Sequence, residues 1–350
     1  MIDAETKHPI ENVSVYISNS SNGTRTDSMG HFKLTLPSNE QVELVLSTMG
    51  YTTKAIPLST SDKLDDLKIY LQAKAADLPD VVLRTYIKDG WKIWGKTFLE
   101  QFIGTYPLND ECKLLNPEAI HFQFKKMDSI LIAFADETLI IENKKIGYLL
   151  HYDLTDFKVD FLNNRTYFQG YPLFEEVNSS RRIIKNRSDI YKGSLMHFMR
   201  SIFLNKLAEN HFEVRKAIKT IQKGGKDIVI DGNTNYDVND IVKLEAIGPY
   251  LVGDSIAYGA SDHTAGMFFD HFLQVTFTDK QVPYYFSKVR SMPGSGNQNI
   301  TSEITLTKKK PLYIYQNGSF QESNNLLITG YWSWAEKLGY LLPFDYVPTK

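Results

Sequence analysis

Polar and apolar residues alternate through four stretches of the first 71 residues, and this alternation limits the fold more than any other feature of the sequence. The apolar positions are Val13, Val15 and Ile17; Phe32, Leu34 and Leu36; Val42, Leu44 and Leu46; and Leu67, Ile69 and Leu71. Residues two apart lie on one face of a strand, so each stretch is typical of a half-buried strand. Clusters of Ser, Asn, Gly and Pro separate the stretches. This pattern predicts a small antiparallel β-sandwich.

The periodicity changes near residue 90. Trp91, Trp94, Phe98 and Phe102 recur at three- and four-residue spacing, which predicts a helix over 91–102. Strand patterns fill 120–177 and 227–311, a helical block covers about 180–212, and 331–342 predicts a short aromatic helix. The predicted fold class is mainly β, α+β overall.

We predict three parts along the chain. Residues 1–77 form the sandwich, 78–90 form a linker, and 91–350 form a strand-rich α+β domain of unknown function.

The composition excludes several functional classes. The chain has 350 residues, with 39 Lys and Arg against 41 Asp and Glu, so a polycation that binds nucleic acid does not fit. It has no run of 18 apolar residues that would span a membrane. The single cysteine, Cys112, cannot form an intramolecular disulfide, which leaves the compartment open.

An ordered string of short segments in the first 51 residues resembles the carboxypeptidase-like regulatory domain. The segments are Asp3-Ala4-Glu5-Thr6, Pro9-Ile10, Val13-Ser14-Val15, 26–32 (TDSMGHF), Leu44-Val45-Leu46-Ser47 and Met49-Gly50-Tyr51. This resemblance implies a transthyretin-like, Greek-key β-sandwich, of the kind found in metallocarboxypeptidase tails and at the front of TonB-dependent receptors. Within it, Gly30 sits where a hairpin needs positive φ, and Asp27 and Ser28 are placed to cap the turn.

Further segments resemble longer Bacteroidetes proteins that carry this domain before a second one. They include Trp94-Gly95-Lys96-Thr97-Phe98, Leu115-Asn116-Pro117-Glu118, Tyr191-Lys192-Gly193-Ser194 and Tyr331-Trp332-Ser333-Trp334. The resemblance implies an exported protein, periplasmic or associated with the outer membrane. The family's first strand normally precedes Asp3-Ala4-Glu5-Thr6, and Met1–Glu5 lacks the features of a signal peptide. We therefore expect the natural start to lie upstream.

One cluster of ligand-type side chains stands out between residues 248 and 272: Asp254, Asp262, His263, Asp270 and His271. Alternating His and Asp can bind a divalent ion or relay protons. A structural alternative explains the same pattern: the aspartates belong to turns, and a histidine on a strand faces solvent. These five residues are the candidate ligand-binding positions.

Other motifs favour structural roles. His8 and Glu11, with His121 far away, only superficially resemble a zinc site, because the first two fall in a turn of the sandwich. Ser194 lacks the G-x-S-x-G context of a nucleophile and is predicted to cap a helix that carries His197. Neither catalytic nor metal-binding residues are assigned, and no cofactor is predicted.

The function favoured by these observations is a non-enzymatic binding or assembly protein of the bacterial cell envelope. Its partner is expected to be an envelope protein, bound by β-augmentation or loop contact, or a glycan. One alternative is a hydrolase of glycans or peptides that uses Asp254, Asp262 and Asp270. A second is a carbohydrate-binding module that stacks sugars on Tyr331, Trp332 and Trp334.

Overall fold

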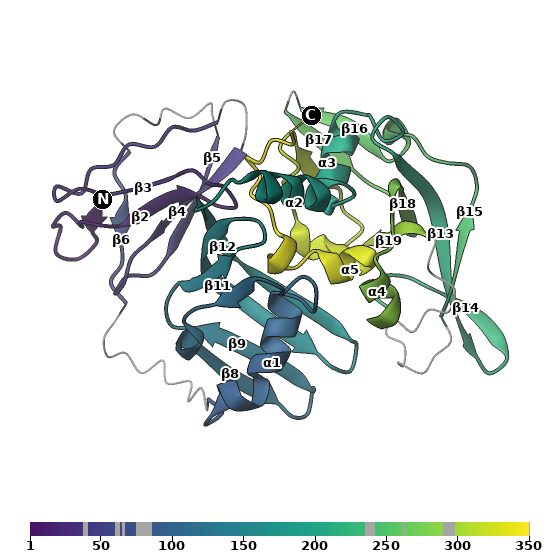
Figure 1. Ribbon diagram of the computed structural model, residues 1–350, viewed down its shortest axis with the longest axis horizontal. Helices are drawn as coiled ribbons and strands as arrows, with labels where there is room; N and C mark the ends of the chain where they lie inside the picture. Colours follow the sequence, from purple (N-terminus) through teal and green to yellow (C-terminus); the bar gives the residue numbers. More distant parts are fainter. Residues whose placement is uncertain are drawn as a thin grey trace.

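The computed structural model describes residues 1–37, 41–59, 64, 67–74, 86–234, 242–261, 263–289 and 298–349. Strands dominate and helices are few, which confirms the predicted mainly β, α+β fold class (Figure 1). In Figure 1 the N-terminal sandwich lies at the left, a sheet covered by α1 lies below, and the remaining sheets lie at the right.

The N-terminal unit is the predicted β-sandwich, but the prediction of a strand at Phe32, Leu34 and Leu36 is wrong, since this stretch packs on the core without joining a sheet. Its larger sheet has the order β3-β2-β4-β5, formed by β2 (Ser14–Ile17), β3 (Gly23–Arg25), β4 (Gln41–Ser47) and β5 (Lys54–Ser59). A second sheet pairs β1 (Ile2–Asp3) in parallel with β6 (Tyr70–Leu71). The alternating residues enclose one core, which includes Val13, Val15, Leu44, Leu46, Ile69 and Leu71.

The turn chemistry expected at Asp27 and Gly30 is confirmed. Asp27 Oδ1 accepts hydrogen bonds from the backbone N–H groups of Met29 and His31, at 2.9 and 2.8 Å. Gly30 has φ 72°, and a Cβ there would meet the Met1 carbonyl oxygen at 2.4 Å. Only glycine fits this position without strain, because a side chain would suffer both the positive φ and the close contact.

The next unit packs one helix on a sheet. The helix α1 (Gly90–Phe102) begins and ends close to the predicted bounds and buries Phe98 and Phe102. The sheet order is β7-β10-β11-β9-β8, and β12 also pairs with β11. The strands are β7 (Cys112–Leu114), β8 (Ile120–Lys125), β9 (Ile130–Ala135), β10 (Leu139–Asn143), β11 (Tyr148–Asp160) and β12 (Arg165–Glu176), with a 3₁₀ turn η1 (Pro117–Ala119) before β8.

The predicted helical block is two helices, α2 (Arg181–Tyr191) and α3 (Leu195–Phe203). The chain breaks between them at Gly193, where φ is 76° and a Cβ would meet the Phe277 ring at 2.7 Å. Ser194 caps α3 as predicted, since its Oγ accepts the His197 backbone N–H at 3.1 Å.

Two further sheets complete the fold. The larger has the order β14-β13-β18-β19-β22, and β15 also pairs with β13; the smaller has the order β16-β17-β20-β21. The strands are β13 (Phe212–Lys223), β14 (Lys226–Ile230), β15 (Val242–Ile247), β16 (Ala257–Ser261), β17 (Thr264–Met267), β18 (Phe272–Gln281), β19 (Asn299–Leu306), β20 (Leu312–Tyr315), β21 (Phe320–Gln321) and β22 (Leu326–Gly330). Short helical segments are η2 (Gly253–Ser255), α4 (Tyr284–Val289), η4 (Ser323–Asn325), α5 (Tyr331–Ala335) and η5 (Leu338–Tyr340).

The range 91–350 contains two separate hydrophobic cores, and the C-terminal segment joins them. Trp332 belongs to the core of the last two sheets, whereas Leu338 and Leu342 belong to the core under α1. Gly339 lies between them, where its N–H donates to the Ile103 carbonyl at 2.9 Å. The predicted helix over 331–342 therefore splits into α5 and η5, because its apolar residues serve two different cores.

The sandwich is joined to the neighbouring sheet by buried polar contacts. Tyr16 donates its hydroxyl to Asp153 Oδ2 at 2.8 Å, and Thr138 donates to Asp153 Oδ1 at 2.5 Å. A short parallel bridge pairs Ser20 with Leu173. These contacts fix the turn after β2, which is one wall of the cavity described below.

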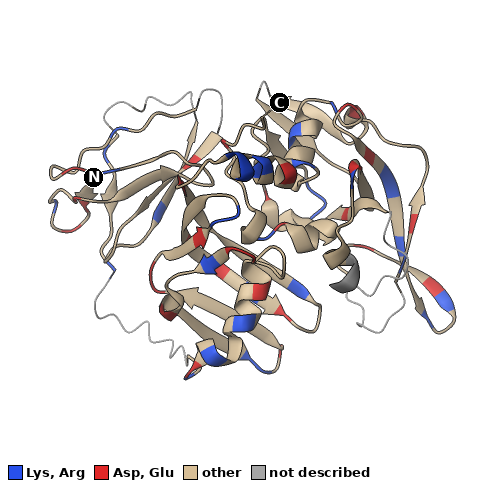
Figure 2. Cartoon of the chain, viewed as in Figure 1, with Lys and Arg blue, Asp and Glu red and all other residues tan. Residues whose placement is uncertain are grey.

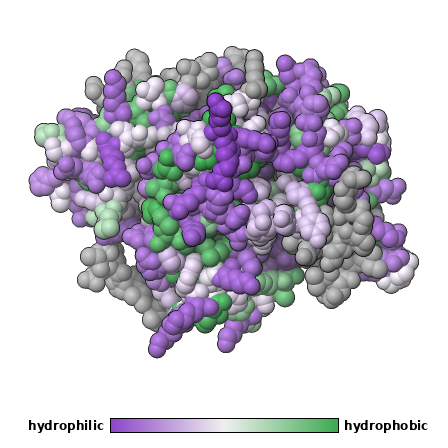
Figure 3. Space-filling view, viewed as in Figure 1, coloured by the Kyte–Doolittle hydropathy of each residue, from purple (hydrophilic) through white to green (hydrophobic). Residues whose placement is uncertain are grey.

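Hydrophilic side chains dominate the face of the molecule drawn in Figure 3, and hydrophobic ones show only in small groups. No helix within the described ranges is long and apolar enough to cross a membrane.

His197 makes stability depend on pH. Its Nδ1 accepts the Gly193 backbone N–H at 3.2 Å, so this nitrogen carries no proton. Burial, followed by the positive charge of Arg200, lowers the pKa of His197 to about 4. A lowered histidine pKa means that the unfolded chain takes up the proton first, so stability falls as the pH drops from about 6.5 to about 4. At 1.36 kcal/mol per unit, the loss is on the order of 3 kcal/mol.

We expect His197→Gln to remove most of this acid-dependent loss. Urea unfolding at pH 7.5, 6.5, 5.5 and 4.5 measures it, with His8→Gln in an exposed turn as the matched control. Equal pH dependence in both variants would contradict the assignment.

Candidate functional site

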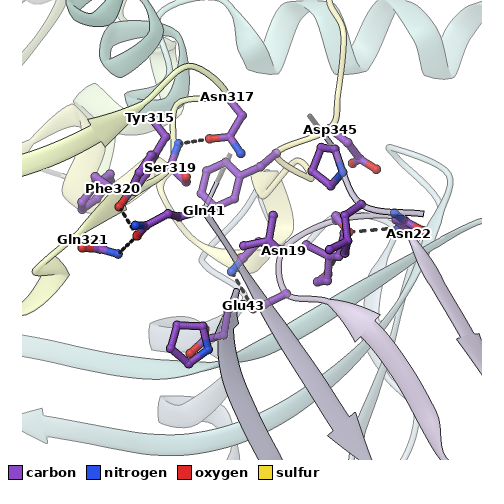
Figure 4. A pocket seen from close by; sticks show the side chains of 18 of the residues that line it. Asn19, Asn22, Gln41, Glu43, Tyr315, Asn317, Ser319, Phe320, Gln321 and Asp345 are labelled. Atoms are coloured by element: carbon purple, nitrogen blue, oxygen red, sulfur yellow. Dashed lines mark hydrogen bonds between the residues drawn. The ribbon is translucent and has the colours of Figure 1, made fainter. Parts of the chain in front are cut away.

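A cavity of about 510 Å³ lies between the sandwich and the C-terminal part of the chain. We call it the interdomain cavity. Its lining comes from the turn 17–22 after β2, residues 35–37, the start of β4, Pro57 of β5, the β20–β21 hairpin and residues 344–345 (Figure 4). Its volume falls within the range typical of small-molecule and oligomer sites.

Local backbone geometry builds the two opposing walls. In the turn after β2, Asn19 has φ 57°, a conformation that asparagine tolerates better than most residues, and the Ile17 N–H donates to the Asn22 carbonyl at 3.0 Å. Across the cavity, the β20–β21 hairpin turns at Gly318, where φ is 85°, and Tyr315 N–H donates to the Ser319 carbonyl at 2.9 Å.

Direct hydrogen bonds join the two walls at one end of the cavity. Gln41 Oε1, at the start of β4, accepts from the Tyr315 hydroxyl at 2.8 Å and from Gln321 Nε2 at 2.9 Å (Figure 4). At the other end, Asp345 Oδ2 accepts from the Ser21 backbone N–H and hydroxyl, at 2.9 and 2.6 Å. The cavity therefore depends on segments about 300 residues apart in the sequence.

The described lining residues combine apolar and uncharged polar side chains and include no Lys or Arg, so they supply no positive charge. The acidic residues of the described lining are Glu43 and Asp345. Burial raises the pKa of Glu43 and, on the opposite wall, that of Tyr315. The uncharged polar residues are Ser18, Asn19, Ser20, Asn22, Thr35, Gln41, Asn317, Ser319 and Gln321. Such a surface suits a ligand that is neutral or positively charged and forms many hydrogen bonds.

The predicted ligand-binding residues lie elsewhere, and none lines the interdomain cavity. Asp254 is exposed in η2, His263 is exposed in the β16–β17 turn, and Asp270 and His271 are exposed in the turn before β18. Asp262 lies outside the described residues. Among the four described members, no hydrogen bond or ion pair joins one side chain to another. In the described parts of the chain, no three His, Cys, Asp or Glu side chains gather as metal ligands.

The histidines of the superficial zinc pattern belong to different units. His8 is exposed in the sandwich, whereas His121 lies on β8, stacks on Tyr86 with ring centroids 4.9 Å apart, and bonds Asp136. In the described part of the chain, neither histidine belongs to a group of three or more potential metal ligands.

The aromatic residues near the C-terminus are structural. Trp332 is 1% exposed and donates its indole N–H to the Gly193 carbonyl at 2.7 Å. Trp334 donates its indole N–H to Thr105 Oγ1 at 3.0 Å. Tyr331 is also buried. These rings are therefore not available as a surface platform for sugars.

Basic side chains gather on α2, which is blue over much of its length in Figure 2. Arg182 pairs with Glu111 at 3.1 Å. Arg187 points inward and is only 5% exposed. The basic run therefore serves partly as internal structure.

The sequence carries no signal that marks the cavity residues as a site. The polar cluster at 19–23 is typical of a turn, and neither Gln41 nor the β20–β21 hairpin matches a binding motif. Their spacing carries no motif, because the side chains meet only after the sandwich packs against the C-terminal segment.

Comparison with known families supports the identity of the first unit. Neither curated proteins nor solved structures give a match to the chain. Residues 1–83 match the CarboxypepD_reg-like domain, which is the regulatory-like domain expected from the sequence.

Proposed function

We propose that this protein is a non-catalytic binding protein of the bacterial cell envelope, and that its ligand occupies the interdomain cavity. A CarboxypepD_reg-like domain suggests a binding or regulatory role for residues 1–83. The single observation that carries the proposal is that this domain supplies one wall of a cavity of about 510 Å³, while the C-terminal part supplies the other.

The composition of the walls favours binding over catalysis. Most hydrogen-bonding groups in the cavity are amides and hydroxyls, which titrate far from neutral pH and are poor proton-transfer groups. Of the three acids suggested for a hydrolase, Asp254 and Asp270 are exposed in separate turns outside the cavity, and Asp262 lies outside the described residues. The proposal therefore rests on the cavity and not on these acids.

Blocking the cavity tests the binding function. We expect Thr35→Trp to fill the cavity, because Thr35 lines it and no described residue bonds the Thr35 hydroxyl. Thr52→Trp makes the same change at an exposed sandwich position outside the lining and serves as the matched control. The probes are neutral trisaccharides, trigalacturonate, tri-lysine and tri-glutamate.

We expect at least one probe to raise the melting temperature of the wild type and of Thr52→Trp, but not that of Thr35→Trp. A ligand at 100 times its Kd stabilises the folded state by about 2.7 kcal/mol, which is readily measured. A probe that stabilises all three proteins equally binds elsewhere, and the absence of any shift would refute the proposal.

The envelope location is tested separately. We expect a tagged copy expressed from the native locus to fractionate with the periplasm or outer membrane. Recovery with the cytoplasmic fraction would contradict this part of the proposal and leave the binding test unaffected.

A further inference from the structure

We infer that the interdomain cavity binds a neutral oligosaccharide. This inference rests on the proposed function and names the chemical class of its ligand. It is carried by the charge of the lining, by the polar atoms that remain open there, and by the aromatic side chains beside them.

The charge of the lining excludes anionic ligands. Phosphate, sulfate and carboxylate groups are recognised by Arg, Lys or several converging backbone N–H groups. Among the described residues of the lining there is neither Lys nor Arg, and Glu43 and Asp345 are acidic. An anionic glycan or an acidic peptide would be repelled.

Several polar atoms in the cavity remain open within the described part of the chain. The side-chain amide N–H groups of Gln41 donate to no described residue, because its hydrogen bonds to Tyr315 and Gln321 both use Oε1. Asn19 and Asn22 use their amide nitrogens, toward Ser18 Oγ and the Thr35 carbonyl, and leave their Oδ1 atoms as acceptors.

The open groups are thus a mixture of donors and acceptors. No described side chain bonds the Glu43 carboxylate, and Asp345 has a second oxygen beyond the one that Ser21 occupies. A sugar hydroxyl both donates and accepts, so a polyol can satisfy amide N–H groups and carboxylate oxygens in the same site. A purely cationic ligand would leave the Gln41 donor unsatisfied.

Apolar side chains supply the remaining contact surface. Phe320 and Phe344 line the cavity and are half-buried, as are Leu36 and Pro37 on the sandwich side. Apolar faces with a small number of placed polar groups are typical of ligand pockets, and the C–H faces of pyranose rings pack on such surfaces.

Isothermal titration calorimetry on the full chain tests the ligand class. The probes are maltotriose, cellotriose, mannotriose and tri-N-acetylchitotriose, with trigalacturonate and tri-lysine as charged counterparts. We expect one or more neutral trisaccharides to bind with a Kd that is unchanged between 0.05 and 0.5 M NaCl, since screening affects only charged partners.

Side-chain variants locate the binding. Gln41→Ala is expected to weaken binding by about tenfold or more, which is the effect of losing one to two hydrogen bonds. Gln72→Ala, at an exposed sandwich position outside the cavity, is the matched control and should bind like the wild type. Gln41 also joins the two walls, so its replacement changes the cavity itself. Asn22→Leu is therefore the second variant. The hydrogen bond from the Ile17 N–H to the Asn22 backbone carbonyl does not involve the Asn22 side chain and still holds this turn.

The outcomes separate this inference from the proposed function. If tri-lysine binds, and its binding weakens with added salt and in Glu43→Gln, the inference that the ligand is a neutral saccharide is wrong. The cavity would still be a binding site, as the proposed function states. Binding of trigalacturonate in preference to neutral sugars would also overturn the inference. Neutral trisaccharide binding that survives both Gln41→Ala and Asn22→Leu would place the sugar elsewhere and refute the inference.

Discussion

Replacing Arg187 by methionine is expected to lower the free energy of unfolding by about 2–3 kcal/mol, the cost of removing a charged hydrogen-bond donor from its backbone carbonyl acceptors. The Arg187 side chain is only 5% exposed. Its Nε donates to the Ile146 carbonyl at 2.7 Å, and its terminal nitrogen donates to the Asn178 carbonyl at 3.0 Å. The guanidinium also stacks on the Tyr148 ring at 3.9 Å.

The loss arises because methionine fills the volume but leaves buried carbonyls without a donor. Urea unfolding measures the change, and Arg181→Met, an exposed position on the same helix, is the matched control. We expect Arg187→Lys to be destabilising as well, because an ammonium group cannot reproduce the planar fork or the stacking. A loss below 1 kcal/mol for Arg187→Met would show that α2 does not depend on this network.

The second large effect is expected for Asp153→Ala, which should lower the free energy of unfolding by about 2–3 kcal/mol. Asp153 is 9% exposed and accepts hydrogen bonds from Tyr16 and Thr138. Its removal leaves two hydroxyl groups in the interface with fewer partners. Because Tyr16 belongs to the sandwich and Asp153 to the neighbouring sheet, the change also loosens the packing of these two units.

A double-mutant cycle with Tyr16→Phe isolates the contact between the units. Tyr16 also donates to the Tyr171 carbonyl at 3.0 Å, so the coupling energy is expected to be smaller than the effect of Asp153→Ala itself. The control is Asp128→Ala, in an exposed turn. If Asp153→Ala and Asp128→Ala differ by less than about 0.5 kcal/mol, the buried network does not hold the sandwich in place.

Asp153→Ala and Arg187→Met are expected to differ in their effect on ligand binding in the interdomain cavity. The turn after β2 contributes Asn19 and Asn22 to the lining, and this turn is anchored next to the Tyr16 contact. Loosening that anchor should weaken ligand binding, whereas Arg187→Met acts at a distance from the cavity lining. Measuring ligand affinity in both variants distinguishes a specific effect on the cavity from general loss of stability.

Local sequence patterns predicted the elements that are formed by interactions between residues close together in the chain. The spacing of Trp91, Trp94, Phe98 and Phe102 predicted α1 because a helical face repeats every 3.6 residues. Ser194 was predicted as an N-cap because its hydroxyl only has to reach the N–H three residues ahead. Gly30 was predicted as a turn residue because positive φ is a property of a single residue.

Local patterns do not reveal outcomes that depend on distant partners. The basic run around Arg187 is typical of a solvated helix face, yet the pairing of α2 with Tyr148 and Glu176 buries that side chain. The predicted helix over 331–342 divides because Trp332 and Leu338 enter different cores. Neither result can be read from a window of a few residues.

Local sequence patterns were sufficient for the mainly β class, the sandwich at the N-terminus, the helix predicted over 91–102, the N-cap at Ser194 and the resemblance to a regulatory-like domain. These follow from periodicity and turn chemistry, which act over a few residues. The interdomain cavity, in contrast, follows from the tertiary structure. The interdomain cavity brings Gln41 to Tyr315 and Ser21 to Asp345, and such contacts form only when distant segments gain more from burying apolar surface together than they lose in chain entropy.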